Sequence, residues 1–271
     1  MVNPYRPIET IVEDVITESS TIKTVVLKPK EQIEFKAGQF IELTVPGLGE
    51  APFTPSSSPY VKDRMEVTIM KAGAVTSATH DLKKGDTVGL RGPFGKEYPI
   101  DQFKGKDILI VGGGVGLAPL RSLLLALFHN ISDVNKINLR YGARTQKDII
   151  YKEQVDKWAK HEKTEVHLTV DNGDKEWKGH VGLITTILNN KMGIDMNNNV
   201  AVVCGPPIMM KFSTLKLVDL GYAPENIYLS MERNMSCGIG KCNRCKVGKM
   251  YVCTDGPVLT WEQVKDIPDP F

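Results

Sequence analysis

Four of the five cysteines of this sequence lie close together near its C-terminal end, and the fifth, Cys204, stands apart. The clustered residues are Cys237, Cys242, Cys245 and Cys253. Their first three members have C-x4-C-x2-C spacing, which is typical of plant-type [2Fe–2S] ferredoxins. The fourth cysteine follows after only seven residues, a shorter gap than in those ferredoxins.

Thiols grouped in this way predict metal ligation. The N-terminal residues MVNPYRPIETIVEDV lack the basic-then-apolar pattern of an export signal. We therefore expect a cytoplasmic protein, in which clustered cysteines bind metal rather than form disulfides. Gly238 and Gly240 would let the backbone fold tightly around the sulfurs and aim N–H groups at them. A four-cysteine structural zinc site is the alternative. Zinc ribbons normally carry two C-x2-C pairs, and this segment has one, so we favour an iron–sulfur cluster.

A glycine-rich turn, GGGVGLAP, begins at Gly112 between an apolar run and a set of leucines at helical spacing. Such a turn lets the backbone approach a pyrophosphate, and the N-terminus of the following helix supplies N–H groups. The turn departs from G-x-G-x-x-G because a leucine stands at the third glycine position. A tight structural turn is the alternative interpretation. The candidate nucleotide-binding residues are Gly113, Gly114, Gly116 and Leu117.

A second turn, Cys204-Gly205-Pro206-Pro207, also follows an apolar run and precedes a helical pattern. Ligands of open α/β sheets bind at the carboxyl ends of the strands, so the thiol of Cys204 can face a substrate there. A buried, inert cysteine is the alternative.

The segment APFTPSSSP, residues 51–59, combines an aromatic side chain with several hydroxyls. Phe53 can stack on a flat polar ligand, and Thr54 or Ser56 can hydrogen-bond to it. The alternative is a turn-rich loop without a ligand. Two further loops, Lys71–Thr76 and Leu90–Gly95, are candidates for holding phosphate or closing over a ring.

Two kinds of hydrophobic pattern divide the chain. Residues 21–28, 39–45 and 65–69 show the period-two or β-branched pattern of strands, which predicts an antiparallel barrel or sandwich. After residue 103, predicted strands alternate with predicted helices, which is typical of a doubly wound parallel sheet. These strands are expected at 107–111, 137–141, 165–170, 200–204 and 227–231, and the helices at 147–160, 183–189 and 208–220.

We therefore expect three parts: a β-barrel domain at 1–102, an α/β domain at 103–232 and a metal-binding segment at 233–271. The last segment has few apolar residues, so we expect a metal to hold it together. The net charge of +2 excludes a strongly basic nucleic-acid binder. No apolar run reaches the ~20 residues that a membrane span requires.

The order of these motifs, PFTPSSS, GGGVGLAP, CGPP and then four cysteines, resembles the ferredoxin–NADP reductase superfamily over nearly the whole chain. Within it, GEAPFTPSSSP and MERNMSCGIGKCNRCKVG are most similar to flavin subunits that feed partner enzymes. These are the B subunit of anaerobic sulfite reductase and the gamma subunit of sulfhydrogenases, and more distantly the electron-transfer subunit of dihydroorotate dehydrogenase.

The resemblance implies FAD in the barrel, NAD(P)H on the α/β domain and a [2Fe–2S] cluster at the C-terminal segment. The superfamily holds its flavin with an Arg-x-Tyr-Ser motif, and Ala51 stands here in place of the arginine. Phe53 and Thr54 match the Tyr and Ser of that motif. Thr54 and Cys204 would lie next to the position at which the hydride is transferred. Arg144 would meet the phosphates or the adenine of the nicotinamide nucleotide. The remaining residues implied for flavin are Pro52, Pro55, Ser56 and the phosphate-turn residues Gly73, Val75 and Thr76; Cys204, Gly205 and Pro206 are implied for nicotinamide.

The implied function is an oxidoreductase subunit that takes a hydride from NAD(P)H through FAD and passes single electrons through the cluster. No terminal substrate site is visible in the sequence, so we expect a partner reductase subunit in a hetero-oligomer without a membrane span, and the motifs favour that of anaerobic sulfite reductase. Sulfhydrogenase and dihydroorotate dehydrogenase partners are alternatives. Two other classes stay open: a flavoenzyme serving a diffusing ferredoxin, and a zinc-bound nucleotide-sensing protein.

Overall fold

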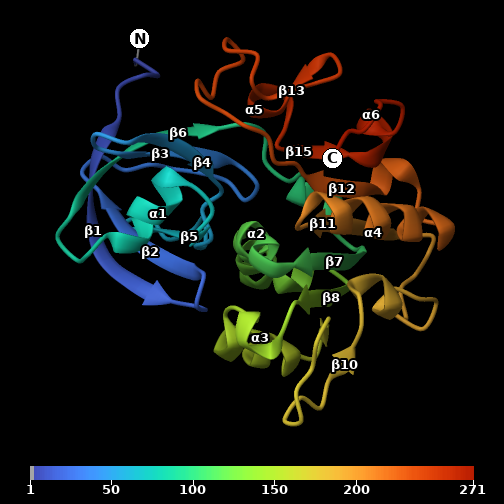
Figure 1. Cartoon of the computed structure of the whole chain (residues 1–271). Coiled ribbons are helices and arrows are strands. Elements are labelled where there is room, and N and C mark those ends of the chain that lie inside the picture. The colour runs from blue at the N-terminus through green and yellow to red at the C-terminus, as the bar shows by residue number, and fades with distance from the viewer. Residues whose placement is uncertain (1–2) are drawn as a thin grey trace. The chain divides into compact units, whose positions relative to one another are not determined.

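The computed structural model describes residues 3–271, and the chain forms two compact units (Figure 1). The first unit comprises Met1–Tyr98, Arg121–Ala126 and Met231–Val258. The second comprises Pro99–Leu120, Leu127–Ser230 and Leu259–Phe271. Each unit is therefore assembled from separate stretches of sequence, and the cysteine segment belongs to the unit that the N-terminal residues form.

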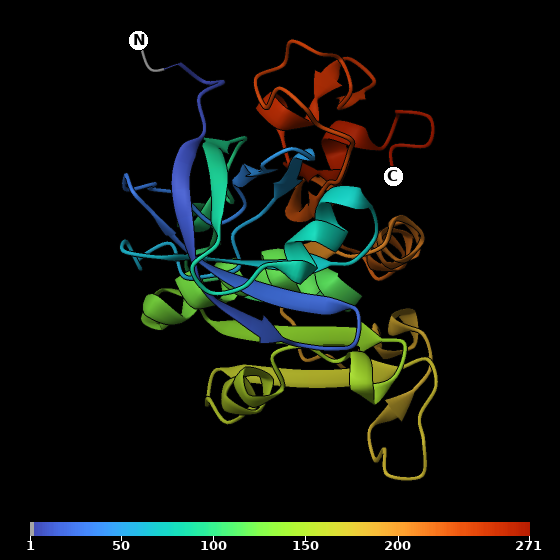
Figure 2. The same cartoon turned by 60° about the vertical axis from the view of Figure 1, so that its left-hand side comes forward.

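The first unit contains a six-stranded antiparallel sheet in the order β4-β3-β6-β1-β2-β5. Figure 2 shows the long pair β1 and β2 in blue. This sheet confirms the expected antiparallel barrel. The strands are β1 (Ile8–Thr17), β2 (Ile22–Pro29), β3 (Phe40–Val45), β4 (Gly49–Phe53), β5 (Met65–Met70) and β6 (Thr87–Phe94).

Alternating burial explains why the period-two segments form these strands. In β5, Met65, Val67 and Ile69 are almost fully buried in one core cluster, which also takes Ile41 and Leu43 from β3. Side chains at alternate positions of a strand point to one face, so each strand contributes every second residue to the core. The helix α1 (Ala74–Asp81) contacts β3, β4 and β5 and was not predicted, because its sequence AVTSATHD has no clear apolar stripe.

The second unit is built on a seven-stranded sheet in the order β10-β9-β8-β7-β11-β12-β15. The pairs from β10 to β12 are parallel. Every residue of the central strand β7 is buried, as its continuous apolar run predicts. The doubly wound α/β fold is confirmed. The strands are β7 (Asp107–Gly113), β8 (Lys136–Ala143), β9 (Thr164–Val170), β10 (His180–Val181), β11 (Asn199–Cys204), β12 (Ile227–Ser230) and β15 (Val258–Thr260).

The helices that connect these strands are α2 (Leu117–His129), α3 (Lys152–Ala159) and α4 (Pro207–Asp219), and α6 (Trp261–Val264) follows the last strand, β15. Short 3-10 turns complete the chain at Ile100–Phe103, Gly114–Gly116, Ile131–Asp133, Gln146–Asp148, Ile184–Ile187 and Pro224–Asn226. No helix within residues 3–271 has the length and apolar character needed to cross a membrane.

Three local predictions were wrong. The helix expected over 147–160 begins only at Lys152, because Tyr151 adopts a left-handed conformation with φ 54° and interrupts it. The helix expected over 183–189 is a single 3-10 turn. The segment Leu90–Gly95, expected to be a loop, lies largely in strand β6.

The cysteine segment packs more of its side chains than its composition suggests. It forms the two-stranded ladder β13 (Lys246–Val247) with β14 (Met250–Tyr251), followed by the short helix α5 (Val252–Asp255). Val247, Val252 and Leu259 are buried. The expectation that only a metal could hold residues 233–271 together is therefore corrected, since apolar packing also contributes.

Candidate functional site

The four clustered cysteines influence one another electrostatically. The neighbouring Cys242 thiol affects the pKa of Cys237, and the thiols of Cys245 and Cys237 affect the pKa of Cys253. Cys242 is exposed, whereas the other three thiols are buried. In the part of the chain that the structure describes, no three His, Cys, Asp or Glu side chains are placed to share one metal ion. Four thiols are the donor set of a [2Fe–2S] cluster and equally of a structural zinc ion, so the donors by themselves fit either metal centre.

Backbone N–H groups point at these sulfurs. The amides of Ile239 and Lys241 donate to the Cys237 sulfur over 3.5 and 3.3 Å, and the amide of Gly240 donates to the Cys253 sulfur over 3.1 Å. Gly240 has φ of +73°, a conformation that favours glycine. The sulfur environment is therefore of the kind that tunes a bound iron–sulfur cluster, because N–H donors stabilise negative charge on the ligands.

The thiols of Cys237 and Cys253 differ in acidity. Burial alone would raise the pKa of Cys237, but the amides of Ile239 and Lys241, with that of Cys242, lower it to about 6. Burial and the neighbouring Cys245 raise the pKa of Cys253 to about 12. Thiolates crowded in this way need a cation to be ionised together. The donor set thus fits a positively charged metal centre.

Arg91 of β6 connects the barrel to the cysteine segment inside the first unit. Its side chain is only 3% exposed. Its Nη2 donates to the Ser236 carbonyl over 3.0 Å, and its Nη1 donates to the Cys237 carbonyl over 3.3 Å. On the barrel side, it forms an ion pair with Glu50 over 2.5 Å and donates to the Pro4 carbonyl over 2.9 Å. The guanidinium therefore fixes the backbone at the first cysteine.

Phe94, three residues further along β6, fixes the next residue of the cysteine segment. A Cβ atom on Gly238 would lie 2.7 Å from the Phe94 ring, and Gly238 has φ of +72°. Only glycine fits this close approach without displacement. The Arg91 guanidinium also lies 5.5 Å from the centre of the Phe94 ring. Sequence reasoning missed both residues because it assigned LRGPFG to a loop; the clue was a lone arginine in an otherwise apolar run.

A buried carboxyl completes this region. Glu42 of β3 stands opposite Arg91 in the strand register and is fully buried. Neither of its oxygens has a hydrogen-bond partner among the described residues. Burial raises the pKa of Glu42 to about 7; the Arg91 charge lowers it, and Glu50 and Cys237 raise it further.

In the second unit, the two predicted nucleotide turns are brought together. They follow β7 and β11, which are adjacent parallel strands. A Cβ atom on Gly116 would lie 2.5 Å from the Cys204 carbonyl oxygen, and one on Gly205 would lie 3.2 Å from the backbone of Gly113. Both turns therefore require glycine for their contact, at the carboxyl edge where open α/β sheets bind ligands.

The other candidates of this edge are placed as follows. The Leu117 side chain is fully buried, and its N–H returns to the carbonyls of Gly114 and Val115, so it supports the turn. Arg144 follows β8 and is exposed. Cys204 is 7% exposed at the end of β11, and Pro206 precedes the first residue of α4.

In the barrel, the hydroxyl-rich segment follows β4. Phe53 packs partly against the barrel core, and Thr54 is half-buried. The Ser56 hydroxyl, by contrast, is buried and bonded to Glu66 and Thr68 of β5. Ser56 therefore anchors the segment to β5. Pro52 lies in β4, and the next proline, Pro55, is buried.

The phosphate-turn candidates lie at the N-terminus of α1. The Thr76 hydroxyl accepts hydrogen bonds from the amides of Ala72 and Gly73 over 2.9 and 2.7 Å. Val75 packs its side chain against the barrel core. The hydroxyl of Thr76 thus shapes the turn, and it is the amides of the first helical turn that remain for an anion.

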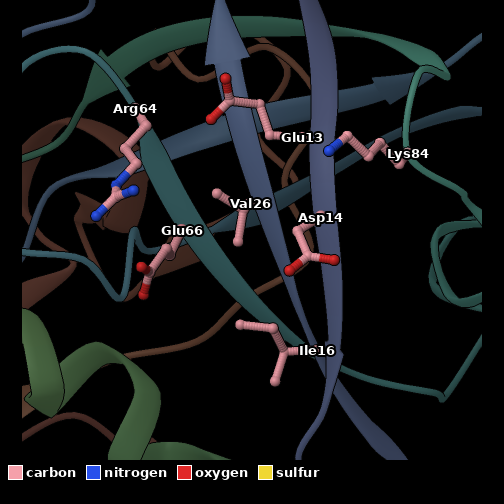
Figure 3. A pocket seen from close by; sticks show the side chains of 7 residues that line it. All are labelled: Glu13, Asp14, Ile16, Val26, Arg64, Glu66 and Lys84. Atoms are coloured by element: carbon pink, nitrogen blue, oxygen red, sulfur yellow. The ribbon is translucent and has the colours of Figure 1, made fainter.

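A hollow of about 450 Å³ lies on the first unit, and it includes none of the predicted residues (Figure 3). Its lining mixes the carboxylates of Glu13, Asp14 and Glu66 with the cations Arg64 and Lys84. It offers no aromatic platform for a flat ring, so we assign the flavin elsewhere.

Comparison with known proteins identifies the class to which this site belongs. Three family models match: an oxidoreductase FAD-binding domain at residues 8–98, an oxidoreductase NAD-binding domain at 110–214, and the iron–sulfur cluster binding domain of dihydroorotate dehydrogenase B at 232–265. The protein is thus an oxidoreductase with FAD-binding, NAD-binding and iron–sulfur-binding parts.

Relatives identify the family. The chain is 39% identical to the sulfhydrogenase 1 subunit gamma of Pyrococcus furiosus over 88% of this chain and 83% of that protein. It is 34% identical to the sulfhydrogenase 2 subunit gamma of the same organism, over 96% of each. It is 32% identical to a probable dihydroorotate dehydrogenase B electron transfer subunit of Methanocaldococcus jannaschii, over 97% and 93%.

A solved structure of the NADH-dependent reduced ferredoxin–NADP oxidoreductase superposes with a TM-score of 0.78 at 25% identity, covering 94% of this chain and 89% of that one. The chain belongs to the ferredoxin–NADP reductase-like family, within the group of sulfhydrogenase gamma and dihydroorotate dehydrogenase electron-transfer subunits. It is an NAD(P)H-linked flavin and iron–sulfur electron-transfer subunit.

Proposed function

We propose that this chain oxidises NAD(P)H through FAD and a [2Fe–2S] cluster and delivers single electrons to a partner reductase subunit. The observation that carries the iron–sulfur assignment is the match of residues 232–265 to an iron–sulfur cluster binding domain, and the C-x4-C-x2-C spacing of Cys237, Cys242 and Cys245 favours the two-iron type. A two-iron cluster needs two thiolates for each iron, whereas zinc needs four around one centre.

The cofactors supply the redox chemistry: bound FAD can take a hydride from reduced nicotinamide and give up its electrons singly, which suits a one-electron cluster. The chain binds and orients them. We assign Phe53 to the flavin ring, the half-buried Thr54 hydroxyl to its polar edge, and Pro52 and Pro55 to the shape of the segment. The Ser56 hydroxyl anchors this segment to β5 through its hydrogen bonds with Glu66 and Thr68.

The flavin diphosphate is assigned to the amides at the start of α1, in the turn that Gly73, Val75 and Thr76 shape. This assignment replaces the family arginine, for which Ala51 stands. Arg91 is not a substitute for it, since its donors already meet Glu50 and three backbone carbonyls.

The nicotinamide nucleotide is assigned to the paired turns of the second unit. Gly113, Gly114 and Gly116 would admit the diphosphate, with Leu117 supporting the turn. Cys204, Gly205 and Pro206 would border the nicotinamide, and the Cys204 thiol would face the ring. Arg144 is exposed at the same edge and would bind the nucleotide's phosphate or adenine.

For the terminal reaction, the motifs of the sequence favour an anaerobic sulfite reductase partner. A sulfhydrogenase partner is the second candidate, because the 39% identity to a sulfhydrogenase gamma subunit favours it. Affinity purification of the tagged chain from its own cells under anaerobic conditions, followed by mass spectrometry, would identify the partner. NAD(P)H-dependent sulfite reduction by the purified complex would support the first candidate; hydrogenase activity without it would support the second.

The cofactor assignment is tested by anaerobic purification with analysis of flavin, iron, sulfide and zinc. The expected result is one FAD, about two irons per chain and a flavin spectrum that NADH or NADPH bleaches. A colourless chain with about one zinc would refute the cluster and favour a nucleotide-sensing role. A chain that purifies from its own cells without any partner and sustains turnover with soluble ferredoxin would instead favour a self-sufficient flavoenzyme.

A further inference from the structure

The segment that holds the cysteines carries an unusual concentration of positive charge. Between Arg233 and Asp255 the sequence contains no acidic residue. Over the same stretch four exposed basic side chains occur within nine residues: Lys241, Arg244, Lys246 and Lys249, called here the basic collar. Their combined charge exceeds the net +2 of the entire chain.

In the described part of the chain, these basic side chains do not form internal ion pairs. Among the residues that the structure describes, none of the four collar side chains has a hydrogen-bond or salt-bridge partner. Other exposed lysines of the chain do have such partners, for example Lys30 with Glu9 and Lys36 with Glu97. Unpaired cations of one sign on one short segment produce a positive potential over the surface, which attracts an oppositely charged partner.

The collar surrounds the one exposed ligand. Cys242 is exposed, and it lies between Lys241 and Arg244 in sequence, while the other three clustered thiols are buried. Asn243, with φ of 62°, and Gly248, with φ of 58°, turn the backbone within the collar. The exposed edge of the candidate cluster and the positive surface are thus one place.

We propose that the basic collar is the docking surface for the electron-accepting protein, and that the acceptor presents an acidic face to it at Cys242. This inference rests on the proposed function, because it takes Cys242 as the exposed edge of the electron-transferring cluster. The collar accelerates the encounter and orients the acceptor, and the electron leaves at Cys242.

The alternative role for these charges is to offset the negative charge of a thiolate-ligated cluster. The two roles differ in what they change. Charge compensation alters the midpoint potential of the cluster. Docking alters the second-order rate constant and its dependence on ionic strength. Salt screens the attraction between exposed charges that are more than a Debye length apart, which is ~10 Å at 0.1 M.

The test uses the loaded protein, reduced with NADH or NADPH, and two protein acceptors as probes: an acidic [2Fe–2S] ferredoxin and the basic cytochrome c. The variant is Arg244→Glu/Lys246→Glu. The matched control is Lys152→Glu/Lys157→Glu, which makes the same change of net charge on exposed lysines of α3. Stopped-flow rate constants are measured between 0.01 and 0.5 M ionic strength, with redox titration of each protein's cluster.

For the unmodified protein, the rate constant with ferredoxin should fall at least ~10-fold as salt rises. The collar variant should lose ~10-fold or more at low salt, gain rate with cytochrome c, and keep its iron, flavin and reduction of a small neutral quinone. The control should stay within about twofold of the unmodified protein.

Two results would overturn the docking surface: rates with ferredoxin that do not depend on salt, or a collar variant whose slower rate is accounted for by a lowered cluster potential. A preparation that contains flavin but no iron and reduces neither protein probe would overturn the proposed function instead, so the two failures are distinguishable.

Discussion

Replacing Arg91 should loosen the cysteine segment without disturbing the flavin site. In Arg91→Met, the carbonyls of Ser236 and Cys237 lose their hydrogen bonds to the guanidinium, while a side chain of similar length remains to fill the space. A hydrogen bond to a charged donor contributes ~1.5 kcal/mol at the low end, so the two together contribute about 3 kcal/mol. At ~1.4 kcal/mol per tenfold change, local opening of the segment becomes roughly 150 times more frequent.

The assay is the rate at which a ferrous chelator removes iron from the reduced, loaded protein. Arg91→Met is expected to release iron about 100 times faster than the unmodified protein. Arg91→Lys, which keeps the charge but has only three donors on one nitrogen, should lie between them. The matched control is Arg64→Met, since Arg64 is an exposed arginine of the same unit that makes no hydrogen bond or ion pair with the described residues.

Iron release from Arg91→Met within twofold of the unmodified rate, at normal flavin content, would refute the reasoning. If Arg91→Met does not fold, the test moves to Arg91→Lys, whose expected effect is smaller but of the same sign.

Three further predictions follow from the same geometry. Burial raises the pKa of Glu42 from 4.5 to about 7 in the folded state, where Arg91, Glu50 and Cys237 are the charged groups around it. Between these two pH values the folded state holds a proton that the unfolded state has lost. The free energy of unfolding should therefore fall by about 3 kcal/mol as the pH rises from 4.5 to 7. Glu42→Gln should flatten this dependence in denaturant unfolding at a series of pH values, and an unchanged slope would contradict it. Gly238→Ala should lower iron content while flavin is retained, because its Cβ meets the Phe94 ring at 2.7 Å, and Phe94→Leu should restore part of the iron. Gly116→Ala should weaken NAD(P)+ binding at least ~10-fold in calorimetry, since its Cβ lies 2.5 Å from the Cys204 carbonyl oxygen; equal affinity would show that the turn does not carry the nucleotide.

Much of the architecture followed from periodicity. The alternation of Met65, Val67 and Ile69 and the apolar run before Gly112 gave correct strands, because burial on one face or on both leaves a direct trace in the sequence. The start of α3 did not, since the left-handed Tyr151 that delays it is a feature of backbone conformation with no clear residue signal.

The candidate site was predictable where residue type and spacing coincide, as in the four cysteines and the glycine turns. The contact between Gly116 and Cys204 was not, because it depends on the neighbouring positions of β7 and β11 in the sheet. Arg91 and Glu42 were also missed. A buried charge inside a strand is recognised only when the partner that compensates it is known, and the partner of Arg91, Glu50, lies 41 residues earlier in the chain.

The discontinuity of the first unit has a consequence for how the protein is made. The six strands of its antiparallel sheet, β1 to β6, are complete once Tyr98 has been synthesised. The Met231–Val258 segment emerges only after most of the second unit. At 5–20 residues per second, the delay is roughly seven to thirty seconds. Throughout that time the guanidinium of Arg91 lacks the two carbonyls that it holds in the finished fold. The barrel sheet is therefore complete before the cysteine segment exists, and the contacts between the two form only after most of the second unit has been synthesised.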